Sequence, residues 1–263
     1  MVINGHYNRN PTIQFYHFFH ELGHFLLAKA NGIRVDEFSL GLGPTLIGKK
    51  IGGTKFCIKL LPFGGACMMG EDDADDMSEG SFNSKSVWAR ISVIAAGPAI
   101  NLILAWIFCV IIILSVGYRS PEISGVSEGY SAAEQGMQAG DVIKEINGRN
   151  VHIWDDVSLY TLTHPNETSL EVVYERDGEE YTAVIEPRQL EGDTTPKLGV
   201  TSGEVVKPGL LGAFQYGAYT VKYWINYTFD SLRMLVTGQL GFKDMSGPVG
   251  IVSAVDSVYQ AAA

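Results

Sequence analysis

The sequence predicts an α+β membrane protein, in which a polytopic α-helical membrane core carries an inserted β-rich domain. Two observations predict this fold class. First, residues 91–118 of the 263-residue chain include no charged side chain, and about 20 apolar residues in a helix span a bilayer core of roughly 30 Å. Second, residues 119–207 hold seven basic and 17 acidic residues, an excess equal to the net charge of −10 of the whole chain. Short alternating apolar segments within this acidic stretch are typical of strands.

The membrane core is predicted from two apolar segments of unequal strength. The stronger gives a transmembrane helix at about 91–117, with Arg90 and Arg119 placed to reach the headgroups. The weaker, Leu210–Val236, is interrupted by three charged residues, Lys222, Asp230 and Arg233. It forms a third membrane segment if those charges face protein or water, and an interfacial amphipathic helix is the alternative.

Charge and cysteine content exclude two classes of function. The chain has no sustained basic surface that could neutralise phosphates, so we expect no nucleic-acid partner. Three scattered cysteines, Cys57, Cys67 and Cys109, are too few for a disulfide scaffold or a cysteine zinc cage. We therefore interpret them as ordinary packing thiols.

The predicted domain organisation has three parts: an N-terminal membrane and catalytic region at 1–118, an extracytoplasmic domain at 119–207, and a third membrane segment with its following region at 208–263. Within the first part, the glycine-rich stretch 33–70 is predicted to form a β-hairpin region. Within the second, strands at 169–176 and 180–187 are joined by Asp177-Gly178, a strong hairpin signal.

Residues 136–148, with the sequence GMQAGDVIKEING, resemble the turn and strand of a PDZ domain. The two glycines and the aspartate precede an alternating strand that leads to a second Asn-Gly turn. PDZ domains bind a peptide as an added strand at a sheet edge. The resemblance therefore implies a peptide ligand for this domain.

The motif that carries chemistry is HExxH, formed by His20, Glu21 and His24 in a segment whose Phe, Leu and Ala content favours a helix. Residues four apart share one helical face, so both imidazoles can bind one Zn²⁺ while Glu21 lies beside them as general base. Zinc lowers the pKa of bound water toward about 7, which makes a nucleophile available for a peptide carbonyl. On the pentapeptide alone, two helix histidines without metal are an equally good interpretation.

A series of motifs removes most of that ambiguity. The chain has FHELGHF at 19–25, FSLGLGP at 38–44, LPFGG at 61–65, AGPAIN at 96–101 and SGPVG at 246–250. In this order, and with the apolar span and the PDZ-like domain between them, they resemble the site-2 proteases, which are intramembrane zinc metalloproteases. The bacterial branch typified by the regulator-of-sigma-E protease is the closer match.

The resemblance implies a function and a set of site residues. His20 and His24 would ligate one zinc ion and Glu21 would be catalytic, in a metalloendopeptidase that cleaves transmembrane segments such as anti-sigma factors or signal-peptide remnants. Residues 61–69 would correspond to a membrane-associated hairpin that binds unwound substrate. The implied substrate-binding residues are Phe63, Gly64, Gly65 and Asn101; this chain has Ala66 where the family often has an aromatic residue.

The sequence also departs from the family pattern. The family's third zinc ligand, an Asp in a Leu-Asp-Gly motif, has no counterpart here, because Asp256 lacks the flanking glycine. The polar start, residues 1–12, makes the first segment a poor independent membrane helix. His17 shares the face of the zinc pair, but three ligands on consecutive turns would strain a tetrahedral site, so we expect an ordinary helix-face residue.

Two other functions compete with the protease. A catalytically incomplete membrane adaptor would bind peptides through the PDZ-like domain, and a soluble HExxH protease would lack the apolar span.

Residues 29–90 have eight Lys and Arg in 62 positions, which by the positive-inside tendency places them in the cytoplasm. We therefore expect a multi-pass protein of the bacterial inner membrane, with lipid and membrane-protein substrates as partners and the PDZ-like domain outside the cytoplasm.

Overall fold

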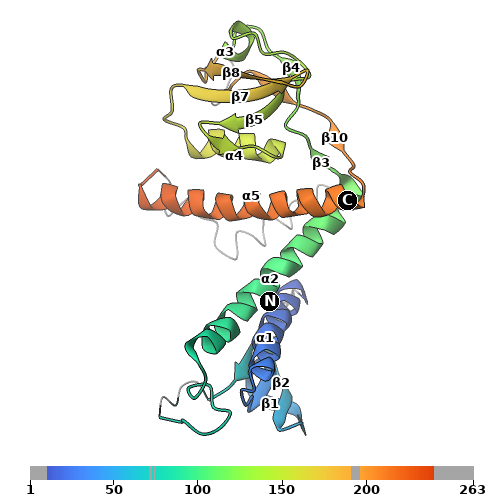
Figure 1. The fold of residues 1–263 in the computed structure, drawn as a ribbon, viewed down its shortest axis with the longest axis vertical. Coiled ribbons are helices and arrows are strands. Elements are labelled where there is room, and N and C mark those ends of the chain that lie inside the picture. The colour runs from blue at the N-terminus through green and yellow to red at the C-terminus, as the bar shows by residue number, and fades with distance from the viewer. Residues whose placement is uncertain (1–10, 71–72, 74, 191–195, 240–263) are drawn as a thin grey trace, which may run out of the picture. The chain divides into compact units, whose positions relative to one another are not determined.

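The computed structural model describes residues 11–70, 73, 75–190 and 196–239. They form two compact units, divided between Ala105 and Trp106 inside one long helix (Figure 1). The SGPVG motif at 246–250 and Asp256 lie outside the described residues.

The first unit begins with helix α1, Pro11–Ala30, which carries the HExxH motif. The turn after the helix contains Gly32, whose φ of 66° suits a residue without a side chain. The amide of Ile33 then donates a 2.8 Å hydrogen bond back to the carbonyl of Ala28, which closes the last turn. This cap turns the chain toward the following strands.

Two long strands, β1 (Glu37–Ile51) and β2 (Thr54–Met68), fold into one curled antiparallel sheet. Residues 37–40 pair with residues 55–58 on one side and with residues 65–68 on the other. No further strand pairs with residues 65–68 in the described part of the chain. The segment 65–68 is therefore a sheet edge, and it lies against α1.

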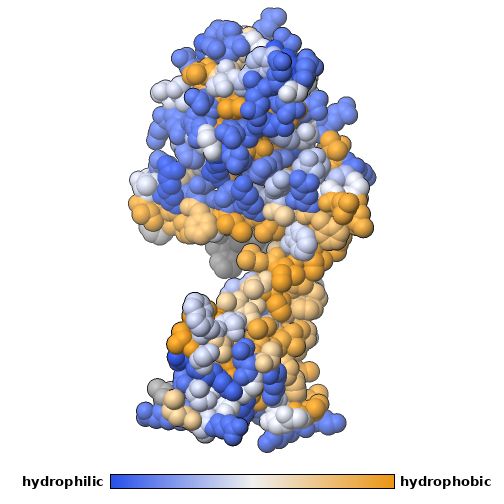
Figure 2. Space-filling model, in the orientation of Figure 1, coloured by the Kyte–Doolittle hydropathy of each residue, from blue (hydrophilic) through white to orange (hydrophobic). Residues whose placement is uncertain are grey.

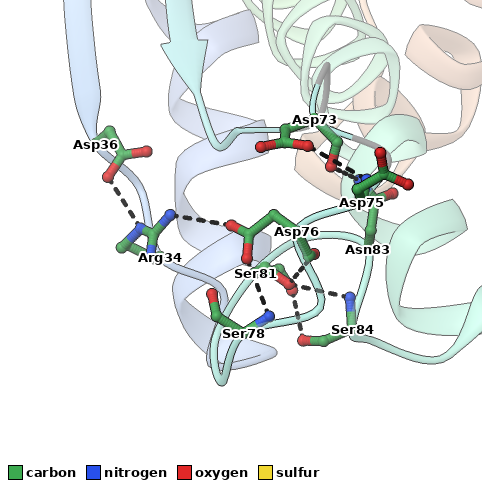
Figure 3. A network of polar contacts seen from close by, with 9 residues as sticks. All are labelled: Arg34, Asp36, Asp73, Asp75, Asp76, Ser78, Ser81, Asn83 and Ser84. Atoms are coloured by element: carbon green, nitrogen blue, oxygen red, sulfur yellow. Dashed lines mark hydrogen bonds and ion pairs between the residues drawn. The ribbon is translucent and has the colours of Figure 1, made fainter.

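A polar loop connects β2 to the next helix and is held by its own hydrogen bonds (Figure 3). Arg34 forms ion pairs with Asp36 and Asp76, and Ser81 Oγ donates a 2.7 Å hydrogen bond to the backbone carbonyl of Asp76. Hydrogen bonds from Ser78 lower the pKa of the Asp76 carboxyl, which keeps it charged beside Arg34. The loop thereby holds Phe82, which is only 8% exposed, in the core of the first unit.

Helix α2, Val87–Val116, is the one helix among the described residues that is long and apolar enough to cross a membrane. Its 30 residues extend about 45 Å at 1.5 Å per residue, and only 11% of its most apolar window is buried. A core helix of a soluble protein would bury most of that surface. The exposed apolar side chains of α2 therefore fit a lipid environment.

The second unit contains a four-stranded antiparallel sheet in the order β6-β5-β7-β8. Its strands are β5 (Val142–Ile146), β6 (Arg149–Asn150), β7 (Leu170–Arg176) and β8 (Glu179–Ile185). Asp177 and Asn147 each adopt a positive φ, followed by Gly178 and Gly148, which the two-residue hairpin turns require. Both predicted Asn-Gly and Asp-Gly turns are thus present.

Shorter elements complete this β-rich unit. Strands β3 (Tyr118–Arg119) and β10 (Val205–Val206) form one pair, and β4 (Ile123–Val126) and β9 (Val200–Ser202) form another. Helices α3 (Ser131–Glu134) and α4 (Trp154–Thr163) pack on the core, which is centred on fully buried Ile143, Ile146 and Leu170. The β-rich domain that the sequence predicted is therefore a packed module.

Helix α5, Leu210–Val236, has two chemically different faces. Its polar face lies against the module, where Asp230 pairs with Arg149 at 2.7 Å and Tyr219 stacks on His152. The opposite face carries exposed apolar side chains at helical spacing: Leu211, Phe214, Ile225, Phe229, Leu232 and Val236. Figure 2 shows this apolar band along α5 beside the hydrophilic module.

One buried ion pair anchors the module. Asp141 is 1% exposed, and both of its carboxylate oxygens accept hydrogen bonds from Arg176 at 2.7 and 2.8 Å. Burial opposes the charged form of Asp141, but the bonds from Arg176 and from the amide of Gln138 outweigh burial and lower the pKa of this carboxyl. The stabilisation is therefore complete above the unfolded pKa of about 3.9 and is lost as pH falls through the lower folded value.

We expect Arg176→Ala to lower the free energy of unfolding by about 3 kcal/mol at pH 7, because it leaves Asp141 buried without its partner. Chemical denaturation of the detergent-solubilised chain measures the loss. Arg188→Ala is the control, since Arg188 makes a similar two-bonded contact with Glu134 on the surface, where such pairs contribute about 0–1 kcal/mol. Equal losses in the two variants would contradict the assignment.

Candidate metal centre

The two histidines of α1 place their ring nitrogens together. His20 Nε2 and His24 Nε2 are 3.2 Å apart, with the ring planes at 80° to each other. Two nitrogen ligands, each 2.0–2.1 Å from a tetrahedral zinc, stand about 3.3 Å apart. The spacing of the two donors therefore suits two corners of a zinc site.

Each imidazole is also oriented through its second nitrogen by helix α2. His24 Nδ1 lies 2.7 Å from the backbone carbonyl of Val93, so Nδ1–H donates to that oxygen and the Nε2 lone pair points to the site. His20 Nδ1 lies 3.1 Å from the side-chain amide nitrogen of Asn101. The Asn101 oxygen is buried without a hydrogen-bond partner.

A half-turn of the Asn101 amide exchanges its oxygen and nitrogen at His20. With the nitrogen toward the ring, Asn101 donates to His20 Nδ1, and the proton of His20 then resides on Nε2. With the oxygen toward the ring, Asn101 accepts from His20 Nδ1–H, and Nε2 has a free lone pair for a metal. The unpartnered oxygen is thus the acceptor that a ligating His20 needs.

Two glycines make the close approach of α1 and α2 feasible. A Cβ on Gly97 would lie 2.4 Å from His24 Nε2 and 2.8 Å from His20 Nε2. A Cβ on Gly23 would lie 2.6 Å from the backbone oxygen of Ala96. The missing side chains therefore leave room for the two ligating nitrogens and for the helix contact that orients them.

Glu21 lies between the histidine pair and the edge of the sheet. A Cβ on Gly65 would come within 2.9 Å of Glu21 Cγ, so the backbone of β2 passes directly over this side chain. Glu21 and His24 also form one wall of a cavity of about 400 Å³. A carboxylate at the wall of a cavity beside a metal site can accept a proton from water held there.

The remaining predicted site residues lie at different distances from this centre. Gly65 lies beside Glu21, whereas Phe63 is 54% exposed and a Cβ built at Gly64 would meet Leu42 at 3.7 Å. Among the described residues, no third His, Cys, Asp or Glu forms a metal-binding group with His20 and His24. His17 accordingly does not join them.

A second cavity, also about 400 Å³, lies in the β-rich module between α4 and β9. Trp154, Val157 and Thr161 of α4 face Val200 and Thr201 of β9 across it. The two walls belong to a helix and a strand, which is the arrangement in which an extended peptide can be held beside a sheet edge.

Some functional features were not predicted from the sequence. Nothing in the sequence singles out the Val93 carbonyl, because a backbone acceptor 69 residues from His24 has no motif. Met69 falls within the predicted substrate-binding hairpin, but the cavity that it forms with Phe82 was not predicted. Phe82 is the one aromatic residue in a polar stretch, and that contrast is the feature of the sequence that could have indicated its burial.

Comparison with known proteins decides the family. A family model described as Peptidase family M50 matches residues 12–263. The chain belongs to peptidase family M50. This M50 chain is 34% identical to a Clostridium acetobutylicum protein over 242 residues, which are 92% of this chain and 71% of the relative.

Two further similarities involve named proteins. The M50 chain is 29% identical to the regulator of sigma-W protease RasP of Bacillus subtilis, over 92% of this chain and 77% of the relative. Among solved structures it is similar to the PDZ domain of an SdrC-like protein from Listeria monocytogenes, with 24% identity and a TM-score of 0.28. That match covers 33% of this chain and 90% of the domain.

Proposed function

We propose that this M50 chain is an intramembrane zinc metalloendopeptidase that cleaves the transmembrane segments of membrane proteins in regulated intramembrane proteolysis. The observation that supports it most is the convergence of His20 Nε2 and His24 Nε2 at 3.2 Å beside Glu21. The name of the Bacillus subtilis relative, a regulator of sigma-W protease, points to anti-sigma factors as one substrate class.

In this proposal His20 and His24 hold one zinc ion per chain. Zinc supplies a Lewis acid that polarises the scissile carbonyl and lowers the pKa of water to about 7. Glu21 takes the proton from the attacking water and delivers it to the leaving amine, as a general base and then a general acid. Val93 and Asn101 keep both rings in the ligating orientation through their Nδ1 atoms.

The substrate backbone is proposed to bind along residues 65–68. One side of this segment pairs with residues 37–40, no further strand of the described part of the chain pairs with the other side, and Gly65 brings the segment over Glu21. An extended peptide that pairs with the edge presents its carbonyl to the centre, whereas a helix hides its carbonyls in internal hydrogen bonds. Phe63 and Gly64 would contact the substrate further along the same strand.

Removal of the metal tests the proposal directly. We expect about one zinc per chain by elemental analysis of the detergent-purified protein, and cleavage of a single-span model substrate. A chelator should abolish cleavage, and added zinc should restore it. Cleavage that continues after the zinc content has fallen to zero would overturn the zinc mechanism, and zinc binding without any cleavage would favour the peptide-binding adaptor.

The Asn101 contact predicts a change in zinc affinity. We expect Asn101→Leu to weaken zinc binding about 10–100-fold, because His20 Nδ1–H loses its acceptor. Competition with a chromogenic chelator measures this. Asn101→Asp, which retains an acceptor oxygen, is the matched control and should bind zinc within a few-fold of the wild type. Unchanged affinity in Asn101→Leu would show that Asn101 does not orient His20.

For localisation, we propose a multi-pass protein of the bacterial inner membrane with a PDZ-like domain outside the cytoplasm. The exposed apolar surface of α2 supports one span. For α5, the charged residues turned toward the module and the opposite apolar face support an interfacial position along the membrane surface rather than a span. The cavity between α4 and β9 is the proposed peptide site of the PDZ-like domain.

A further inference from the structure

The cavity beside Glu21 and His24 has a floor that the catalytic centre does not use. Met69, Phe82 and Val93 form this floor and are 7%, 8% and 0% exposed. Ala66 and Ile94 lie at its rim, on β2 and α2. The cavity therefore starts at the catalytic carboxylate and ends in the hydrophobic core of the first unit.

We propose that this cavity binds one bulky apolar side chain of the substrate, from a residue that flanks the cleaved bond, and that the small side chain of Ala66 sets the size it accepts. The inference rests on the proposed function, because a peptide bond must first lie between Glu21 and the edge segment 65–68. A side chain next to that bond then has the cavity as its immediate neighbour.

The lining selects apolar side chains. Apart from Glu21 and His24, it consists of glycine, alanine, cysteine, methionine, phenylalanine, valine and isoleucine. None of the side chains on the floor can accept or donate a strong hydrogen bond, so a polar substrate residue would be desolvated there without a partner. Thioether and aromatic groups, by contrast, pack well against an inserted Leu, Met or Phe.

The floor is also held in place before substrate arrives. The residues on both sides of Phe82 take part in the loop network of Figure 3: Ser81 donates to the carbonyl of Asp76 and Asn83 donates to the carbonyl of Asp73, at 2.7 and 2.8 Å. The amide of Arg34 bonds the carbonyl of Gly80 at 2.7 Å. A preorganised pocket discriminates by size, since it does not collapse around a smaller side chain.

Ala66 controls the width of the cavity. It lies on the edge segment that receives the substrate, and a methyl group fills little of the space between that edge and α2. A phenyl ring at position 66 would occupy the rim of the cavity. The hydrogen bonds that orient His20 and His24 come from Asn101 and Val93 and do not involve Ala66.

The test uses the full, zinc-loaded chain and single-span model substrates that differ only in the residues flanking the cleaved bond: Gly, Ala, Leu, Phe or Asp. Mass spectrometry identifies the cleaved bond, and kcat/KM is measured for each substrate. We expect the wild type to prefer Leu and Phe over Gly and Asp by at least tenfold. In Ala66→Phe, the ratio of kcat/KM for the Leu and Phe substrates to kcat/KM for the Ala substrate should fall at least tenfold.

Two further variants complete the design. Ile94→Trp narrows the same cavity from the exposed surface of α2, where Ile94 is 61% exposed and a larger side chain does not disturb the sheet. It should shift the preference in the same direction even if Ala66→Phe fails to fold. Ile58→Trp makes the same enlargement as Ile94→Trp, but on β2 at a position that does not line the cavity, and should keep the wild-type preference.

The outcomes separate the two proposals. A wild type that cleaves all five substrates equally, or a preference unchanged in both narrowing variants, would overturn the cavity inference while the protease function stands. A zinc-loaded wild type that cleaves none of the substrates would overturn the proposed function, and the cavity inference with it.

Discussion

Gly97→Ala is expected to remove zinc from the protein while leaving its helices intact. The added methyl group would stand 2.4 Å from His24 Nε2 and 2.8 Å from His20 Nε2, which is within the space that the two ligating atoms occupy. Real Cβ atoms do not approach other atoms this closely, so one imidazole must leave the site. Removing the hydrogen-bond partner of a metal ligand lowers metal affinity about 10–100-fold. Gly97→Ala displaces a ligand itself, so we expect a larger fall in zinc affinity.

Zinc affinity is expected to fall in Gly97→Ala, whereas the stability of helix α2 is expected to rise. Alanine is favoured over glycine inside a helix by up to about 1 kcal/mol, so a loss of zinc in Gly97→Ala is not explained by poor helix formation. Circular dichroism and zinc content measured on the same sample separate the two effects. Gly125→Ala is the control, because a Cβ at Gly125 meets no atom within 4 Å. Full zinc occupancy in Gly97→Ala would show that the two rings do not share this site.

Glu21→Gln is expected to lower the rate of peptide hydrolysis by about 10²–10⁴-fold without loss of zinc, because general acid-base groups contribute rate factors of that size. Glutamine has nearly the same shape as glutamate but cannot accept a proton at neutral pH. The measurement is kcat for the model substrate together with zinc content by elemental analysis.

The matched control is Glu180→Gln, an isosteric change of an exposed carboxylate in β8 of the other unit. It should retain the wild-type rate. If Glu21→Gln kept more than a tenth of the wild-type rate, Glu21 would not be the base. Loss of zinc in the variant would instead assign Glu21 a role in holding the metal.

Local sequence patterns were enough to predict several features. The i, i+4 spacing of His20 and His24 places them on one face of any helix, and α1 is a helix from Pro11 to Ala30. Asp177-Gly178 predicted a two-residue hairpin because only a positive φ fits that turn, and the pairing of Arg176 with Glu179 shows it. Such features depend on residues that are near neighbours in the chain.

Features that depend on distant neighbours were not predicted. The family resemblance placed Asn101 among the substrate-binding residues, and nothing in the sequence predicted that its amide lies against His20, 81 residues away in the chain. Helix α4 was also missed. It is ten residues long, and its buried residues Val157 and Tyr160 belong to the same core cluster as residues of the sheet. Tertiary contacts decide both cases, and no local pattern encodes them.

The glycine contact between α1 and α2 has a consequence for how inhibitors reach the centre. Helix α2 approaches both imidazoles closely at Gly97, and the cavity lined by Glu21, His24 and the edge of β2 gives a route toward the paired nitrogens. A chelating group such as a hydroxamate, carried on an extended peptide, could enter by that route and place its neighbouring side chain over Met69 and Phe82. Metal affinity and side-chain selectivity would then reside in one molecule.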